Sequence, residues 1–76
     1  MKVCIHQLGT NKFSTVIDVP NNCTAKEAMQ NYLPKKYKKL LSEDFTLGIW
    51  GTNLDGKFLP IPESYRLNEN DRIEIY

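Results

Sequence analysis

The last six residues of the sequence, Asp71-Arg-Ile-Glu-Ile-Tyr76, alternate strictly between polar and apolar side chains. A period of two predicts a β-strand with one buried face, on which Ile73 and Ile75 lie. The opposite, outer face then carries Arg72, Glu74 and Tyr76. Because this strand follows every other element, it has to pair with strands formed earlier in the chain. Its placement therefore decides the topology.

Earlier segments supply the partners. Residues 2–8, 12–19 and 45–50 have strand-like patterns, and the turn signal Gly9-Thr10-Asn11 between the first two predicts a hairpin. Alternation assigns several residues to the core face: Val3, Ile5, Phe13, Thr15, Ile17, Val19, Leu47 and Ile49. The same alternation assigns others to the outer face: Cys4, His6, Leu8, Ser14, Val16, Asp18 and Trp50.

Between the second and third strands the pattern becomes helical. Thr24-Ala-Lys-Glu27 fits a capping box, in which the Thr hydroxyl and the Glu carboxylate bond the backbone at a helix start. Inward positions recur at helical spacing: Ala25, Ala28, Met29, Tyr32 and Leu33. Pro34 ends this helix after about ten residues and opens a short second helical turn. In that turn we expect Tyr37, Leu40 and Leu41 to point inward.

The connection from 52 to 64 contains the turn sequence Asn53-Leu-Asp-Gly56. Phe58 and Leu59 follow as a candidate short edge strand, since Pro60 and Pro62 exclude a long or central one. The order is thus hairpin, helix, then further strands, all within a single domain spanning 1–76.

A right-handed crossover through the helix places the third strand parallel to the first. Inserting the last strand between them protects Ile73 and Ile75. The expected fold class is α+β, a ubiquitin-like β-grasp with a mixed four- to five-stranded sheet packed on one main helix.

Several segments carry a resemblance to a known family: Gly48-Ile49-Trp50, Leu67-Asn68-Glu69-Asn70-Asp71-Arg72-Ile73-Glu74-Ile75-Tyr76 and Thr24-Ala-Lys-Glu27-Ala28-Met29. The chain resembles the RnfH family of small bacterial proteins, which show a Gly-Ile-Tyr strand and a Leu-x-x-Gly-Asp-Arg-Val-Glu-Ile-Tyr segment. Asn70 stands where the family has Gly, and Asn also adopts the left-handed turn. The connection at 52–64 is longer than the family's usual one. The family normally continues past the Tyr with Arg-Pro and a basic tail.

The resemblance implies a ubiquitin-like fold and a role that is poorly established. Some members carry the label of antitoxin in a proposed toxin–antitoxin pair, and others are named for a gene neighbourhood near electron-transport components. Neither role follows from particular residues of this sequence.

Charge and hydropathy exclude several classes of function. The sequence has ten Lys and Arg residues and nine Asp and Glu residues, so its net charge is +1. This near balance of charge argues against a dedicated nucleic-acid domain. No apolar run approaches the roughly 20 residues of a membrane span, and the first residues do not form a signal peptide. We therefore expect a cytoplasmic protein with no membrane contact, as a monomer or weak dimer.

The sequence offers little for catalysis or metal binding. Cys4 and Cys23 are expected to be reduced, unrelated surface side chains, because no C-x-x-C pair or export signal accompanies them. His6 is the only histidine, and zinc needs three or four ligands. No phosphate loop or nucleophile motif occurs. We expect no enzyme activity, no cofactor and no metal.

Two groups of residues are candidates for binding. Lys35, Lys36, Lys38 and Lys39 surround Tyr37, either as a patch for phosphate or an anionic surface, or as a solvated segment that Tyr37 anchors to the core. The other group is an outer sheet face for a protein partner, formed by His6, Val16, Trp50, Arg72, Glu74 and Tyr76, with Cys4 beside them. Trp, Tyr and Arg dominate interface energetics. The competing interpretation packs Trp50 partly under the 52–64 connection.

A sulfur carrier of the ThiS or MoaD kind is the alternative function, since those proteins share this fold. Carriers need a flexible Gly-Gly terminus that can be adenylated. Here residues 71–76 read as an ordered strand, so we expect a non-catalytic binding protein instead.

Overall fold

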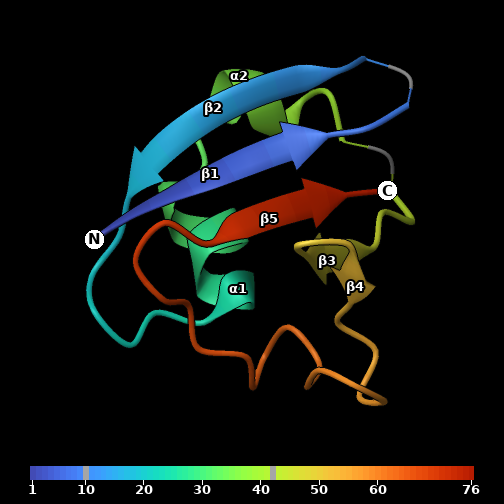
Figure 1. Cartoon of the computed structure of the whole chain (residues 1–76). Coiled ribbons are helices and arrows are strands. Elements are labelled where there is room, and N and C mark those ends of the chain that lie inside the picture. Colours follow the sequence, from blue (N-terminus) through green and yellow to red (C-terminus); the bar gives the residue numbers. More distant parts are fainter. Residues whose placement is uncertain (10, 42) are drawn as a thin grey trace.

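The computed structural model describes residues 1–9, 11–41 and 43–76, and it contains one mixed sheet in the order β2-β1-β5-β3-β4 (Figure 1). The predicted turn at 9–11 includes Thr10, which lies outside the described residues. The strands are β1 (Lys2–Gln7), β2 (Phe13–Asp18), β3 (Leu47–Ile49), β4 (Thr52–Asn53) and β5 (Arg72–Ile75).

The last strand is central, as predicted. β5 runs parallel to β1, with Ile5 beside Ile73, and antiparallel to β3, with Ile49 on the other side of Ile73. β3 therefore runs antiparallel to β1 and parallel to β2, so the prediction that the third strand is parallel to the first is wrong. The hairpin has already reversed the chain at β2, and the crossover through the helical segments starts there, so the parallel strands that it joins are β2 and β3. The predicted insertion of β5 between β1 and β3 is confirmed.

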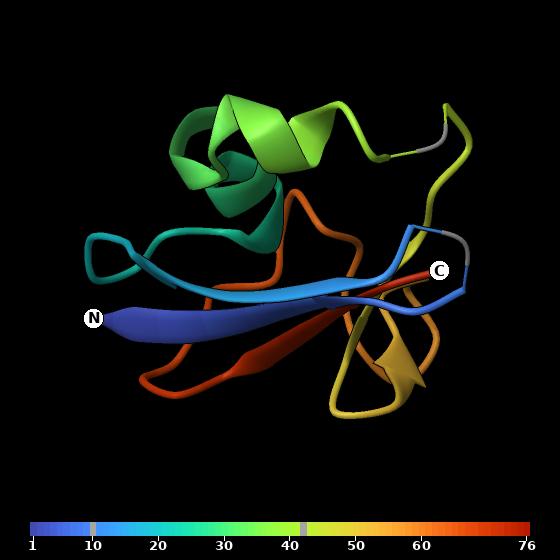
Figure 2. The ribbon, with the colours of Figure 1, turned by 90° about the horizontal axis from the view of Figure 1, so that it is seen from above.

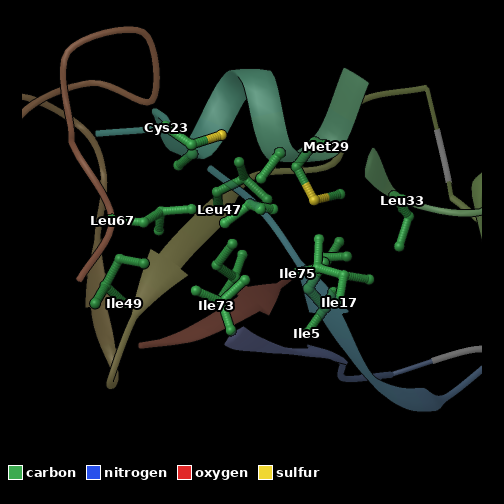
Figure 3. Close-up of a cluster of buried hydrophobic side chains, with 14 of the residues drawn as sticks. Ile5, Ile17, Cys23, Met29, Leu33, Leu47, Ile49, Leu67, Ile73 and Ile75 are labelled. Atoms are coloured by element: carbon green, nitrogen blue, oxygen red, sulfur yellow. The ribbon is translucent and has the colours of Figure 1, made fainter. Parts of the chain in front are cut away.

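All helical segments cover one face of the sheet, and the other face is open (Figure 2). They are α1 (Ala25–Glu27), the π-helix η1 (Ala28–Tyr32) that continues it, and α2 (Lys35–Lys38). Between the two layers lies an apolar core (Figure 3). Its fully buried members include Val3, Ile5, Ile73 and Ile75. The Cα radius of gyration is 11.2 Å, close to the roughly 11.4 Å expected of a compact chain of this length.

The helix starts as predicted but changes its pitch. The Thr24 hydroxyl accepts a hydrogen bond from the Glu27 N–H at 3.2 Å, and the Glu27 carboxylate accepts one from the Thr24 N–H at 3.2 Å. The Leu33 N–H then bonds the Ala28 carbonyl, five residues back, as in a π-helix. This wider turn rotates Tyr32 outward, so its predicted inward position is wrong: it is 40% exposed.

The strand predicted at Phe58 and Leu59 is also wrong. A turn at Trp50 and Gly51 reverses the chain immediately, so Thr52 and Asn53 pair with β3 instead. Residues 55–59 form bends, and Phe58 is 92% exposed. The predicted turn at Asp55 and Gly56 is present, with Gly56 at φ +83°.

Cys23 is in the core rather than at the surface, contrary to the prediction. It is 3% exposed, its backbone carbonyl accepts a hydrogen bond from the Leu67 N–H at 2.8 Å, and its thiol points to the Thr24 carbonyl. Burial, with the nearby Glu27 carboxylate, raises the pKa of this thiol. Both Cys23 and the partly buried Cys4 are free thiols.

Within the described parts of the chain, every helix is too short and too polar to cross a membrane.

Candidate partner-binding face

The open face of the sheet brings together residues from four strands and one turn. Val16, Cys4 and Arg72 form one row across β2, β1 and β5. Ser14, His6, Glu74 and Gly48 form the next row, which extends to β3. We call Trp50, Arg72, Glu74 and Tyr76 the outer-face cluster.

Glu74 is the centre of the cluster, and it is buried although it points away from the core. Its side chain is only 8% exposed. Its Oε1 accepts hydrogen bonds from the Gly51 N–H at 2.6 Å and from the Tyr76 hydroxyl at 2.9 Å. Its Oε2 lies 3.0 Å from Arg72 Nε, in an ion pair rather than an aligned hydrogen bond. Glu74 therefore positions its neighbours and offers little of itself to a partner.

These contacts decide the charge state of the cluster. Burial alone would raise the pKa of Glu74, but the hydrogen bonds from Tyr76 and Gly51 and the charge of Arg72 together hold that pKa below its usual value. The hydrogen bond to Glu74 raises the pKa of the Tyr76 phenol, and burial adds to the effect. At neutral pH the cluster thus contains an ionised carboxylate and a protonated phenol.

Tyr76 lies across the sheet over a glycine. A Cβ atom added to Gly48 would lie 3.0 Å from Cε2 of the Tyr76 ring and 3.1 Å from the Thr52 carbonyl oxygen. A side chain at this position would press on the ring and on the Thr52 carbonyl, so glycine gives the ring the most room. The Tyr76 backbone exchanges two hydrogen bonds with Thr46, of 2.9 and 3.1 Å, which keep the residue in the sheet. The Tyr76 residue is 46% exposed.

Trp50 occupies the turn that joins β3 to β4. Trp50 has φ +49° and Gly51 has φ +85°, and positive φ at both central positions is the pattern of a type I′ hairpin turn. The Trp50 N–H donates a hydrogen bond to the Arg72 carbonyl at 3.2 Å. The Trp50 residue is nevertheless 64% exposed. Trp50 is therefore not packed under the 52–64 connection.

The remaining predicted face residues flank the cluster. Val16 lies beside Cys4 in the first row and is 57% exposed. His6 lies between Ser14 and Glu74 in the second row and is partly buried. Arg72 keeps 35% of its side chain exposed. The structure thus brings all six predicted residues to one face, but it makes Glu74 an internal support.

The lysine-rich segment lies in the helix layer, away from the outer-face cluster. Tyr37 stacks on Phe13 of β2 with ring centroids 4.6 Å apart, which anchors α2 to the sheet. Lys36 Nζ lies 5.0 Å from the centre of the Tyr37 ring, and Lys38 donates a hydrogen bond to the Gln30 carbonyl. The stacking agrees with a segment that Tyr37 anchors to the core, and the binding of phosphate or an anionic surface by the lysines stays a prediction. Lys35 and Lys39 are exposed.

Two contributors to this face were not predicted. Gly51 acts through its backbone N–H on Glu74, and Gly48 acts by having no side chain. In the described ranges, no three His, Cys, Asp or Glu residues lie together as metal ligands would. The absence of metal and cofactor stays a prediction.

A mixed sheet of this strand order, with one main helix on one face, defines the ubiquitin-like β-grasp class of protein. The family model described as RnfH family Ubiquitin matches residues 1–76. The chain therefore belongs to the RnfH family, as its motifs indicate. Neither the curated proteins nor the solved structures contain a significant match to the sequence.

Proposed function

We propose that this RnfH-family chain is a non-catalytic binding module that holds a protein partner on its outer sheet face. The contact residues are Trp50, Tyr76 and Arg72, with Val16 at the margin. Buried aromatic and arginine side chains supply most of the binding energy in protein interfaces. Glu74 supports the face from below, so the partner meets side chains that are already positioned.

One observation carries the proposal: a large aromatic residue stands exposed at a backbone position that disfavours it. The described residues contain four non-glycine positions with positive φ, and the other three are Asn11, Asn22 and Asn70. Asparagine is suited to this conformation, whereas tryptophan is strained in it by about 1 kcal/mol or more. Local stability does not account for Trp50, so a contact with another molecule is the better explanation.

A sulfur carrier is the alternative function, and it would act through a mobile Gly-Gly segment rather than through the sheet. The binding module is preferred because the outer face offers ordered side chains: the Tyr76 backbone is paired with Thr46 and its hydroxyl bonds Glu74. A role as one half of a toxin–antitoxin pair would be a special case of the binding function, with the toxin as partner.

The test is a quantitative pulldown from lysate of the source cells, with the chain and its Trp50→Asn variant as matched baits. Asparagine suits the turn, so this variant keeps the fold while it removes the indole. We expect it to lose the partner, and titration of the purified partner to show about 30-fold weaker binding, as for a hot-spot residue.

The control bait is Phe58→Ala, which removes an exposed aromatic ring outside the face. It is expected to retain the partner. Equal capture by the Trp50→Asn bait, or loss only with the Phe58→Ala bait, would contradict the proposal.

A further inference from the structure

The strand β2 forms one edge of the sheet, and its free side has a defined set of backbone groups. Met1 and Val19 exchange two hydrogen bonds, of 2.7 and 2.8 Å, so they form a hydrogen-bonded pair of the β1–β2 ladder. Such pairs alternate along antiparallel strands. Ile17, Thr15 and Phe13 therefore bond β1, and the N–H and C=O groups of Asp18, Val16 and Ser14 point away from it.

β1 uses its own alternate residues on its other side, which supports this assignment. The Cys4 and Leu8 N–H groups bond β5 or the residue before it, and the Lys2 carbonyl accepts from Asn70. No backbone or side-chain hydrogen bond to the outward groups of β2 is found among residues 1–9, 11–41 and 43–76. An edge of this length is a template for another strand.

We propose that the occupant of this edge is a second copy of the chain, paired antiparallel through β2 with Thr15 on the twofold axis. In this register Lys12 lies opposite Asp18 of the second copy, and Ser14 lies opposite Val16 of the second copy. On the inner side, Phe13 lies opposite Ile17 of the second copy. All the outward N–H and C=O groups then have partners.

Charge complementarity selects the second copy and this register. Lys12 and Asp18 carry opposite charges near the two ends of the edge. A twofold axis midway between them places Lys12 of each copy opposite Asp18 of the other copy, which gives two ion pairs. An axis at Asp18 would instead place two carboxylates face to face, at an energetic cost. If the second copy shifted by one residue along the strand, backbone groups that point away from β1 would lie opposite groups that are already bonded to β1.

The edge also has side chains free to make these contacts. The Asp18 carboxylate lies 3.4 Å from the Met1 amino group, yet its side chain is 74% exposed and can reach a second cation. Val16 is exposed on the outer face, and Lys12 is exposed. Figure 2 places α2 in the helix layer, so the sheet can continue past β2 in its own plane. A contact through one strand is small, so the dimer forms only at high concentration.

The decisive experiment mixes two charge variants, Lys12→Glu and Asp18→Lys. In each variant alone, both facing pairs carry like charges, so we expect sedimentation equilibrium to show at least tenfold weaker self-association than the natural chain. In an equimolar mixture the introduced glutamate faces the introduced lysine, and the unchanged Asp18 faces the unchanged Lys12, so a heterodimer is expected. Folding of each variant is checked by circular dichroism.

The register is tested by disulfide trapping in a Cys4→Ser background. Directly opposed residues that do not exchange hydrogen bonds lie at a Cα separation suited to a disulfide. Thr15→Cys is therefore expected to form a covalent dimer in mild oxidant. Ser14→Cys, one position along the strand, is the matched control and is expected to remain monomeric.

Three results would overturn the proposal. One is a natural chain that stays monomeric at millimolar concentration, which would leave the edge to a strand of some other protein. Another is a mixture of the two charge variants that associates no better than either alone. The third is equal trapping of Thr15→Cys and Ser14→Cys. None of these results bears on partner binding by Trp50, so the two proposals can fail separately.

Discussion

The two faces of β5 obey the same alternation but are stabilised differently. On the inner face Ile73 and Ile75 are buried against the helix layer by apolar contacts. On the outer face Glu74 is almost as well buried, but by a polar network of Tyr76, Gly51 and Arg72. The comparison shows that alternation predicts the direction of a side chain and does not predict its exposure.

The faces also differ in what a substitution removes. An apolar contact depends on shape and on the area removed from water, so its loss leaves a cavity. A buried carboxylate depends on its donors and on pH, so its loss changes the charge of the site. The predictions below test this difference, beginning with the largest expected effect.

Ile73→Ala is expected to destabilise the protein by about 2–5 kcal/mol, because it truncates a fully buried aliphatic side chain between two strands. Denaturant unfolding followed by circular dichroism measures the change. Val16→Ala, on the exposed outer side of β2, is the control and should stay within about 0.5 kcal/mol. Similar values for the two variants would mean that the two faces are assigned wrongly.

Glu74→Gln is expected to destabilise the protein by about 1–3 kcal/mol, because it removes a buried negative charge. The carboxylate accepts hydrogen bonds from Gly51 and Tyr76 and forms an ion pair with Arg72. The same denaturant assay at pH 7 measures it. Asp55→Asn, at an exposed carboxylate outside the face, serves as the matched control and should have little effect. A silent Glu74→Gln would show that the network adds nothing to stability.

The destabilisation by Glu74→Gln should also depend on pH. The pKa of Glu74 is lowered on folding, so the carboxylate contributes stability at pH values above its unfolded pKa, about 4.3. This contribution is lost as the pH falls through the lower, folded pKa. Unfolding curves at a series of pH values should show the natural chain and the variant converging in acid. A constant difference down to about pH 2 would contradict the role assigned to the charge.

Sequence patterns were sufficient for the parts of the fold that depend on local rules. Alternation placed Ile73 and Ile75 in the core, the capping box located the helix start, and the need to protect the two isoleucines placed β5 between β1 and β3. The crossover rule was applied from the first strand instead of the second, so it gave the third strand the wrong direction. In the other places where the sequence interpretation was wrong, the reason lies in backbone geometry that composition does not reveal. The π-helical turn moved Tyr32, and the tight turn at Trp50 replaced the strand predicted at 58–59.

The candidate site was predictable as a set of residues but not as a mechanism. The alternation of side chains along each strand was enough to place five residues on one face: His6, Val16, Arg72, Glu74 and Tyr76. The Glu74 carboxylate accepts from the N–H of Gly51, which belongs to a turn that no sequence motif indicated. It also accepts from Tyr76, whose ring lies against the bare Gly48. Long-range contacts of this kind require the assembled sheet.

Gly48→Ala is expected to destabilise the protein by about 1–2 kcal/mol, because the new methyl group would meet the Tyr76 ring at 3.0 Å and the Thr52 carbonyl at 3.1 Å. Tyr76→Ala in the same background removes one of the two contacts. The double-mutant cycle should therefore show coupling between the two positions. Strict additivity would mean that the ring does not lie over the glycine.

The smallest expected effect has the opposite sign. Trp50→Asn should stabilise the isolated protein by about 1 kcal/mol, because asparagine relieves the strain of φ +49° and forms the Asn-Gly pair that this turn favours. In a chain of this size that corresponds to a rise in Tm of about 4–8 °C, which calorimetry can measure. Ile73→Ala and Glu74→Gln weaken the fold because both faces of β5 support it, whereas Trp50 detracts from it. A variant that is more stable and yet fails to bind would show that this position is maintained for recognition. A destabilised Trp50→Asn would instead assign the indole to the fold and remove the main reason for placing a partner on this face.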